Sequence, residues 1–406
     1  MQDAPLINFL VVVAAIVLAP LIVNAIARVK VPVVVVEIAL GIVIGPHVLG
    51  LAQRDAFVAG LAHLGLAFLF FLAGFEIDFG RIRGRPLKLA AYGWLLSLAL
   101  SLAVAAALYA TDVIVLVRYA AIAMTTTAIG TLMPMLRDAG EVETPLGRFV
   151  LAAGAVGEFG PIVLTALLLS HENSQIGTLL LLVAFGGVVL LAIRLAQRWH
   201  PASIVRLAQR TMNSSAQLPM RLSVLVLIAL ISVAVTLRLE FLLGAFAAGV
   251  IVAQAIKDIE HDDLEPLRIK YEGVSFGLFV PIFFVVTGMT FDLPALFSSA
   301  RSLLELPLFV VLFLVVRGLP AWLLSRHVLP EASRRALALL SATQLPLIVA
   351  ITTLGLQQQQ MRPSTAAAMV GAGMLSVFIF PLLALTLVRP RRFSSEIAGT
   401  SASVSP

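Results

Sequence analysis

The sequence contains no cysteine and few charged residues. The absence of cysteine excludes disulfide frameworks, thiolate metal sites, iron–sulfur clusters and cysteine nucleophiles. Charged residues make up only 12% of the 406 residues, roughly half the fraction that is typical of a soluble domain. Hydrophobic residues make up 60%, and the mean hydropathy is +1.04. These values exclude a water-soluble globular protein.

Hydrophobic stretches of about 20 residues, the length that crosses about 30 Å of hydrocarbon, recur along the chain. This pattern predicts an all-α polytopic membrane protein rather than a barrel, whose strands alternate over about 10 residues. We expect thirteen transmembrane helices, at about residues 5–28, 31–46, 56–79, 87–110, 114–135, 146–170, 176–197, 218–237, 240–256, 273–290, 303–324, 333–355 and 363–388.

The formal net charge of +6 reflects a strongly uneven distribution of basic residues. If the N-terminus lies outside, five of the 28 Lys and Arg fall in outer gaps: Arg54, Arg118, Arg238, Arg301 and Arg362. Arg317 falls inside a span, and all the others fall in gaps on the opposite side. The positive-inside rule therefore predicts an outer N-terminus and a cytoplasmic C-terminus. No cleaved signal peptide is expected, because a basic region at the N-terminus is missing.

Two halves of the sequence resemble each other. The third span ends in FFLAGFEID (70–78) and the tenth in FFVVTGMTFD (283–292), each with two Phe, a Gly and an Asp four residues later. The second and ninth spans are both rich in glycine, and the fifth and twelfth both combine threonine with proline. Equivalent spans are seven apart, an odd number, so the pattern predicts inverted six-helix repeats, as in many secondary transporters. Chance similarity between hydrophobic segments is the alternative.

Three ionisable residues are predicted to lie deep in the membrane: Glu37, Glu158 and Arg317. A charge at this depth costs about 2.5–3.5 kcal/mol on insertion scales, so each needs a partner or a function. Glu158 lies halfway along its span within AGAVGEFGP (153–161). A proton neutralises such a carboxylate, whereas its ionised oxygens bind an alkali cation, so competition between the two is sufficient for exchange. The alternative is a permanent salt bridge between Glu158 and Arg317.

The fifth and twelfth spans are predicted to be broken. Thr125, Thr126, Thr127 and Pro134 lie in the fifth, and Thr343, Gln344 and Pro346 lie in the twelfth. An internal proline frees backbone carbonyls, which is tolerated only where the segment faces protein or a water-filled cavity. Broken, crossing helices whose ends meet at mid-membrane would suit an ion site.

Other acidic residues are given structural roles. Glu37, which follows Pro32, is interpreted as a helix-packing carboxylate. Glu76 and Asp78 are expected to form interfacial ion pairs with Arg81 and Arg83.

Several motifs together resemble the monovalent cation:proton antiporter-2 family, the Kef-type branch of bacterial sodium or potassium/proton antiporters. The first runs over residues 31–50, from Val31-Pro32 through Glu37, Gly41 and Gly45-Pro46 to Leu49-Gly50. The others are residues 64–78, which begin with LG and end with FLAGFEID, LGR (146–148), LGAFAAG (243–249), and residues 281–289, which begin with PIFF and end with GM. The resemblance extends over about residues 5–388. It implies a sodium/proton antiporter fold, a homodimer in the cell inner (plasma) membrane, and elevator-type alternating access.

The resemblance also implies a domain order along the chain. We expect dimerisation-domain helices at 1–86, core helices at 87–172, a linker helix and cytoplasmic loop at 173–217, further dimerisation-domain helices at 218–300, core helices at 301–388, and a disordered cytoplasmic tail at 389–406. No nucleotide-binding domain of the Kef type is expected after this tail. Glu158 and Arg317 fall in the places of the family's essential acidic residue and its basic partner, and Thr125 to Thr127 match its hydroxyl-rich unwound segment.

One position departs from the family. Members usually carry a polar residue followed by an acid, such as Asn-Asp, and this chain has Gly157 followed by Glu158. A single carboxylate favours electroneutral exchange of one proton for one cation, Na⁺ or K⁺.

Two other functional classes stay open at this stage. One is a non-transporting sensor or assembly protein, and the other is a symporter or channel for a different solute on the same scaffold. An enzyme is not expected, since no nucleophile, metal or cofactor constellation is evident, and neither is a nucleic-acid partner. No Walker A signature is present, which argues against ATP-driven transport.

Overall fold

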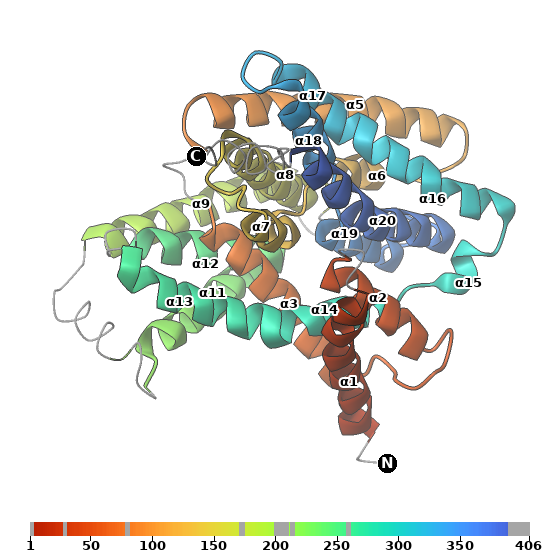
Figure 1. Ribbon diagram of the computed structural model, residues 1–406, viewed down its shortest axis with the longest axis horizontal. Helices are drawn as coiled ribbons and strands as arrows, with labels where there is room; N and C mark the ends of the chain where they lie inside the picture. Colours follow the sequence, from red (N-terminus) through yellow and green to blue (C-terminus); the bar gives the residue numbers. More distant parts are fainter. Residues whose placement is uncertain are drawn as a thin grey trace, which may run out of the picture.

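The protein is built from helices (Figure 1). The computed structural model describes residues 4–26, 31–77, 82–169, 175–198, 211, 216–256 and 261–388, and no strand occurs among them. The predicted all-α class is confirmed. The predicted tail at 389–406 and the expected ion-pair residues Asp78 and Arg81 lie outside the described residues.

Most of the predicted spans correspond to long apolar helices. In the described part of the chain, eleven helices are long and apolar enough to cross a membrane. The predicted second and ninth spans correspond to two shorter apolar helices, Val33–Ile44 and Phe241–Ala255. With 12 and 15 residues, these two fall short of the roughly 20 residues that a full crossing needs. The count of thirteen spans therefore stays a prediction.

One group of helices packs around α3 and α14. Its members are α1 (Ala4–Ala25), α2 (Val33–Ile44), α3 (Ala56–Phe75), α11 (Leu218–Thr236), α12 (Phe241–Ala255), α13 (His261–Val274), the π-helical segment η1 (Ser275–Phe279) and α14 (Val280–Met289). Within it, α12 packs on α3 and α14 packs on α2. Asp55 caps the start of α3 by accepting a hydrogen bond from the N–H of Val58 at 2.9 Å.

A second group lies beside the first. It contains α5 (Arg85–Ala110), α6 (Val117–Met124), α7 (Ile129–Asp138), α8 (Pro145–Leu169), α16 (Ala300–Phe313), the π-helical segment η2 (Leu314–Gly318), α17 (Leu319–Leu324), α18 (Glu331–Ser341), α19 (Pro346–Gln357) and α20 (Pro363–Val388). The helix α9 (Gln175–Arg198) contacts both α8 and α12, and the short α15 (Leu293–Leu296) leads from α14 to α16. In Figure 1, α5, α16 and α17 lie along one side of this group, and the first group lies along the other.

The two halves of the chain repeat a close helix contact. A Cβ at Gly41 of α2 would lie 2.0 Å from the carbonyl oxygen of Val285 in α14, and a Cβ at Gly249 of α12 would lie 1.9 Å from the carbonyl oxygen of Phe71 in α3. Only glycine permits such an approach, which is how small residues pack membrane helices closely. The spans concerned are the second with the tenth and the ninth with the third. In the predicted repeat, the second span is equivalent to the ninth and the third to the tenth. The two glycine contacts are therefore equivalent to each other, and the predicted repeat is also present in the helix packing.

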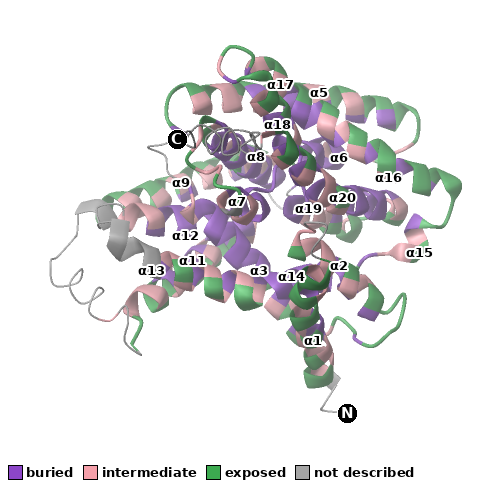
Figure 2. Cartoon of the chain, in the orientation of Figure 1, coloured by how far each residue is buried: buried purple, intermediate pink, exposed green. Residues whose placement is uncertain are grey.

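Burial differs sharply between helices (Figure 2). The two segments that contain the helix breaks are the most enclosed, with 89% of the window in residues 117–137 and 72% of the window in residues 331–357 buried. By contrast, only 11% of the α9 window is buried, and Leu180 and Val183 are each 65% exposed. Such apolar exposure is expected of a helix that contacts lipid. The broken helices therefore form the centre of the molecule.

Candidate functional site

Two broken helices cross at the centre of the second group. The helix α6 ends at Met124 and α7 begins at Ile129, while α18 ends at Ser341 and α19 begins at Pro346. Between them, the N–H of Ala128 donates to the carbonyl of Thr343 at 2.9 Å. The backbone groups released by the two breaks thus partly satisfy each other, as a water-free environment requires. The predicted crossing of the fifth and twelfth spans is present.

The break in the fifth span does not lie at its proline. Pro134 is inside α7, and the break covers residues 125–128. The N–H of Thr127 leaves the helical pattern to donate to the carbonyl of Gly157 in α8 at 3.0 Å. Assigning this break to Pro134 was therefore wrong, because long-range hydrogen bonds interrupt the helix. In the twelfth span, Pro346 is the first residue of α19, a position that proline favours.

Side chains also connect the two breaks. The hydroxyl of Thr126 donates to Oε1 of Gln344 at 3.1 Å, and the hydroxyl of Thr127 donates to the carbonyl of Ser341 at 2.7 Å. The hydroxyls of Thr125 and Thr343 instead donate to carbonyls of their own helices. All four threonines and Gln344 are at most 1% exposed. Of the residues predicted for the crossing, Thr126, Thr127 and Gln344 contact the other broken helix through their side chains.

Glu158 points its carboxylate at the start of α7. Its Oε1 accepts hydrogen bonds from the N–H groups of Ile129 at 2.8 Å and Gly130 at 3.5 Å. Helix N-termini favour negative charge, because their N–H groups are free and the helix dipole is positive there. The side chain is 3% exposed, and its other oxygen, Oε2, is buried without a hydrogen-bond partner in the described structure. An unpaired buried carboxylate oxygen is costly, which marks it as an oxygen available to a proton or a cation.

Arg317 occupies the space beside Gly157. The π-helical segment η2 carries Arg317 into the core, where it is 1% exposed. Its Nε donates to the hydroxyl of Thr127 at 2.9 Å, and its Nη2 donates to the carbonyl of Ala153 at 2.7 Å. A Cβ at position 157 would lie 2.5 Å from Nη2 and 2.6 Å from the hydroxyl oxygen of Thr127. Glycine at 157 therefore leaves room for the guanidinium.

No ion pair joins Arg317 to Glu158 among the residues that the structure describes. Both acceptors of Arg317 are neutral oxygens from Thr127 and Ala153. The predicted charge partnership between Arg317 and Glu158 therefore stays a prediction, although α8 carries both Glu158 and the carbonyl that Arg317 binds.

Glu76 forms an ion pair, but with a different partner from the one expected. Its Oε1 lies 3.2 Å from Nη2 of Arg137 at the end of α7, and Arg137 also binds Glu272 of α13. The sequence suggested Arg81 and Arg83, which are close in the chain, and contained no signal for Arg137. Glu37 is 5% exposed on α2, which packs against α14, consistent with a carboxylate within a helix interface.

These features define a class of protein: a multi-pass helical membrane protein with inverted repeats and a buried carboxylate where two broken helices cross, an arrangement typical of secondary transporters. A family model described as "Sodium/hydrogen exchanger, transmembrane" matches residues 12–387. The chain belongs to this family.

Individual relatives are distant. The chain is 25% identical over 375 residues to "Putative Na(+)/H(+) antiporter YjbQ" of Bacillus subtilis (strain 168), covering 87% of this chain but 59% of that protein. It is 23% identical over 373 residues to "Na(+)/H(+) antiporter" of Enterococcus hirae, covering 88% of this chain and 91% of that protein. The chain thus spans less than two thirds of the Bacillus protein and most of the Enterococcus protein. These names belong to transporters, in agreement with the expectation that the chain is not an enzyme.

A solved structure has the same fold. The sodium proton antiporter MjNhaP1 from Methanocaldococcus jannaschii, determined at pH 8, superposes with a TM-score of 0.68 over 95% of this chain and 96% of that one. The sequence identity is 17%, so the likeness concerns the fold. It confirms the predicted antiporter fold.

Proposed function

We propose that this protein is a secondary antiporter that exchanges protons for a monovalent cation, Na⁺ or K⁺, at Glu158. One observation carries the proposal: Glu158 is buried at the helix crossing with Oε1 held by the start of α7 and Oε2 unpaired. Membership of the sodium/hydrogen exchanger family supports it independently.

The geometry gives the two oxygens of Glu158 different roles. The N–H groups of Ile129 and Gly130 fix Oε1 and stabilise the ionised carboxylate, leaving Oε2 to take either the proton or the cation. Alkali cations prefer hard oxygen ligands, and the hydroxyls of Thr126 and Thr127 keep lone pairs beyond the bonds they make. A proton at Oε2 removes the negative charge that attracts the cation, so the two ligands exclude each other.

The finer features of the proposal rest on the same residues and on the family resemblance. With one carboxylate, exchange is electroneutral, one proton for one cation. The group containing the broken helices is the moving core of an elevator mechanism, and the group around α3 and α14 forms the homodimer contact, with the domain boundaries given above. Arg317 neutralises Glu158 in the unloaded state. The N-terminus lies outside a bacterial inner membrane, the C-terminus is cytoplasmic, and the chain belongs to the Kef-type branch.

The test is exchange in proteoliposomes that contain an internal pH dye. Addition of Na⁺, K⁺, Li⁺ or Rb⁺ should drive proton movement in the wild type, and Glu158→Gln should abolish it, because a neutral amide can neither release a proton nor balance a cation. Electroneutral exchange should be unaffected by the K⁺ carrier valinomycin when K⁺ is equal on both sides.

A matched control is available in the same group of helices. Glu305 of α16 is 5% exposed, compared with 3% for Glu158, and it lies outside the crossing, where its Oε2 accepts a hydrogen bond from Thr365 at 3.1 Å. Glu305→Gln makes the same chemical change outside the crossing and should retain exchange. Proton movement that persists in Glu158→Gln would refute Glu158 as the shared site, and silence of the wild type with every cation would refute the antiporter.

A further inference from the structure

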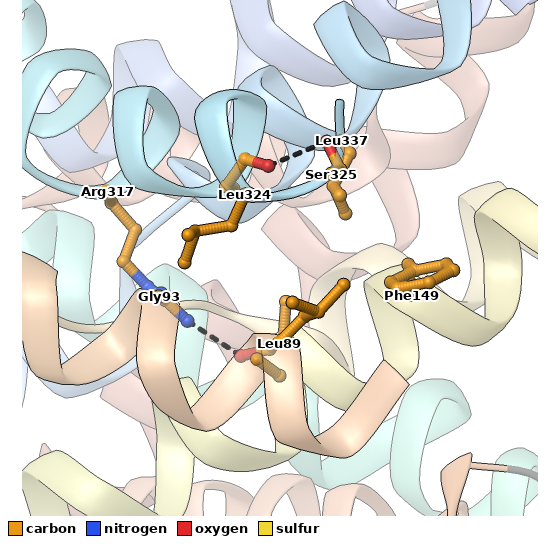
Figure 3. A pocket seen from close by; sticks show the side chains of 10 residues that line it. Leu89, Gly93, Phe149, Arg317, Leu324, Ser325 and Leu337 are labelled. Atoms are coloured by element: carbon orange, nitrogen blue, oxygen red, sulfur yellow. Dashed lines mark hydrogen bonds between the residues drawn. The ribbon is translucent and has the colours of Figure 1, made fainter. Parts of the chain in front are cut away.

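The second group of helices has little free space beside its buried arginine. The cavity next to Arg317 has a volume of about 20 Å³, room for about one water molecule, and its walls include Leu89 and Gly93 of α5 and Leu324 of α17 (Figure 3). A closely packed interior resists changes of shape, because its side chains interlock. Any movement of this group as a whole therefore takes place at its boundary with the first group.

Arg137 forms ion pairs across this boundary. It lies in the last turn of α7, in the second group, and both of its partners lie in the first group. Its Nη2 lies 3.2 Å from Oε1 of Glu76, which directly follows α3. Its Nη1 lies 2.5 Å from Oε1 of Glu272 in α13, which also pairs with Arg268 of the same helix at 3.0 Å. One guanidinium thus joins α7 to two segments of the other group.

These ion pairs are only partly satisfied. The side chain of Glu76 is 5% exposed, that of Glu272 is 25% exposed and that of Arg137 is 32% exposed, so water reaches part of the contact. In the described structure, Oε2 of Glu76 and Nε of Arg137 are buried without a hydrogen-bond partner. A bidentate arginine–carboxylate pair would use both oxygens and would be stronger. The contact is therefore better suited to breaking and re-forming than to permanent attachment.

The helices α3 and α7 lie side by side and run in the same direction next to this contact. A Cβ at Gly130 of α7 would lie 2.9 Å from Cδ1 of Leu69 in α3. Arg137 meets Glu76 seven residues, or about two turns, further along both helices, and each pair is separated by 61 positions. The start of α7 also holds the carboxylate of Glu158. Displacement of this carboxylate along α3 therefore has to break the ion pairs of Arg137.

We propose that Arg137 is a releasable latch between the two groups. Its ion pairs with Glu76 and Glu272 hold the second group in the position seen in the structure, and they break whenever that group moves. This inference rests on the proposed function, in which the second group is the moving core. The described contacts of Arg137 do not include Glu158, so the latch controls how often the core leaves this position and leaves the ion site unchanged.

A cysteine placed at the boundary measures how often the two groups separate. The sequence contains no cysteine, so a single introduced thiol is the only one that reacts. Ala73 of α3 is 1% exposed, lies on the same helix face as Leu69 and Glu76, and shares an apolar cluster with Met133 of α7. In the purified full-length protein in nanodiscs, N-ethylmaleimide reaches Ala73→Cys only when the boundary opens. The alkylation rate therefore reports the open fraction.

Arg137→Gln should raise the alkylation rate of Ala73→Cys at least about threefold, because it removes two partly exposed ion pairs. The matched control is Arg334→Gln, which removes an ion pair of the same length, 2.5 Å to Glu331, within the second group. It should leave the rate unchanged. A second thiol, Ala105→Cys in α5, tests for loosening of the whole group, since Ala105 is 0% exposed; Arg137→Gln should not change its rate.

If Arg137→Gln does not fold, Glu272→Gln decides. It removes only the ion pair at the more exposed carboxylate and leaves the buried Glu76 paired with Arg137. Its alkylation rate at Ala73→Cys should also rise, and the rate at Ala105→Cys should again stay unchanged.

Two results would overturn the proposal. An unchanged alkylation rate at Ala73→Cys would show that the ion pairs do not hold the groups together. Equal increases at Ala73→Cys and Ala105→Cys would show a general loosening of the helices instead of release at the boundary. Failure of the proposed function is detected separately: a wild type that exchanges no cation in proteoliposomes would refute the antiporter, and the alkylation rates would still decide whether Arg137 holds the two groups together.

Discussion

The hydrogen bond between Thr127 and Arg317 allows the stability of a variant to be predicted. Thr127 connects three elements, because its hydroxyl accepts from Nε of Arg317 at 2.9 Å and donates to the carbonyl of Ser341 at 2.7 Å. Thr127→Val keeps the branched shape and removes only the hydroxyl. The variant therefore leaves a buried charged donor and a backbone carbonyl without this partner.

The cost follows from the two lost bonds. A hydrogen bond to a charged group contributes about 1.5–3 kcal/mol and a neutral one about 0.5–1.5 kcal/mol, and unsatisfied buried groups lie at the upper end. We expect Thr127→Val to lower the free energy of unfolding by about 2–4 kcal/mol. Thr352→Val is the matched control. Thr352 is 2% exposed, but its hydroxyl donates only to carbonyls of its own helix, at Ile348 and Val349, so its loss should cost less than about 1 kcal/mol.

Chemical unfolding in detergent, followed by tryptophan fluorescence, compares both variants with the wild type. Equal losses for Thr127→Val and Thr352→Val would refute the reasoning, because Thr127 would then not hold the guanidinium in place. A large loss for Thr127→Val alone would locate the anchor of Arg317 at the crossing.

Two further predictions concern packing and pH. Gly157→Ala would place a Cβ 2.5 Å from Nη2 of Arg317, and overpacking of this kind should lower the free energy of unfolding by about 1–3 kcal/mol. Gly187→Ala is the control and should cost nothing comparable, because its Cβ meets nothing within 4 Å. Equal unfolding curves for the two variants would contradict this prediction. Slight burial raises the pKa of Asp55, but hydrogen bonds from a backbone N–H and from Asn8 outweigh it, so the net pKa is lowered from 3.8. The ionised carboxylate therefore contributes stability at neutral pH that is lost as the pH falls below 3.8, and Asp55→Ala should cost about 1 kcal/mol at pH 7 and progressively less in acid. Unfolding curves of both proteins from pH 7 to pH 3 measure this difference, and a cost independent of pH would contradict the capping role.

The sequence contained enough information for the fold and for most of the crossing. Long apolar runs predict transmembrane helices directly. The paired FF and glycine motifs predicted the inverted repeat, in which the helix contacts at Gly41 and Gly249 are equivalent. Charge in an apolar segment is rare, so Glu158 and Arg317 could be singled out, and both are deeply buried.

Three details could not be predicted, and each depends on long-range geometry. The break of the fifth span lies at Thr125–Ala128 because Thr127 and Ala128 bond to segments far away in the chain, whereas Pro134 is accommodated within α7. Arg137 reaches Glu76 only after two helices are placed side by side. The neutral partners of Arg317 likewise depend on where its long side chain ends, which spacing along the sequence does not determine.

The glycine at position 157 changes the charge balance of the proposed exchange. The guanidinium of Arg317 occupies the space that a side chain at this position would need, since a Cβ at 157 would lie 2.5 Å from its Nη2. The crossing therefore contains one carboxylate, one guanidinium and the positive end of α7. With Glu158 ionised and a cation on Oε2, the summed charge equals that of the protonated carboxylate without a cation. If the core crosses the membrane in either loaded state, it carries the same charge in both directions, and this equality is the physical basis for expecting one-for-one, electroneutral exchange.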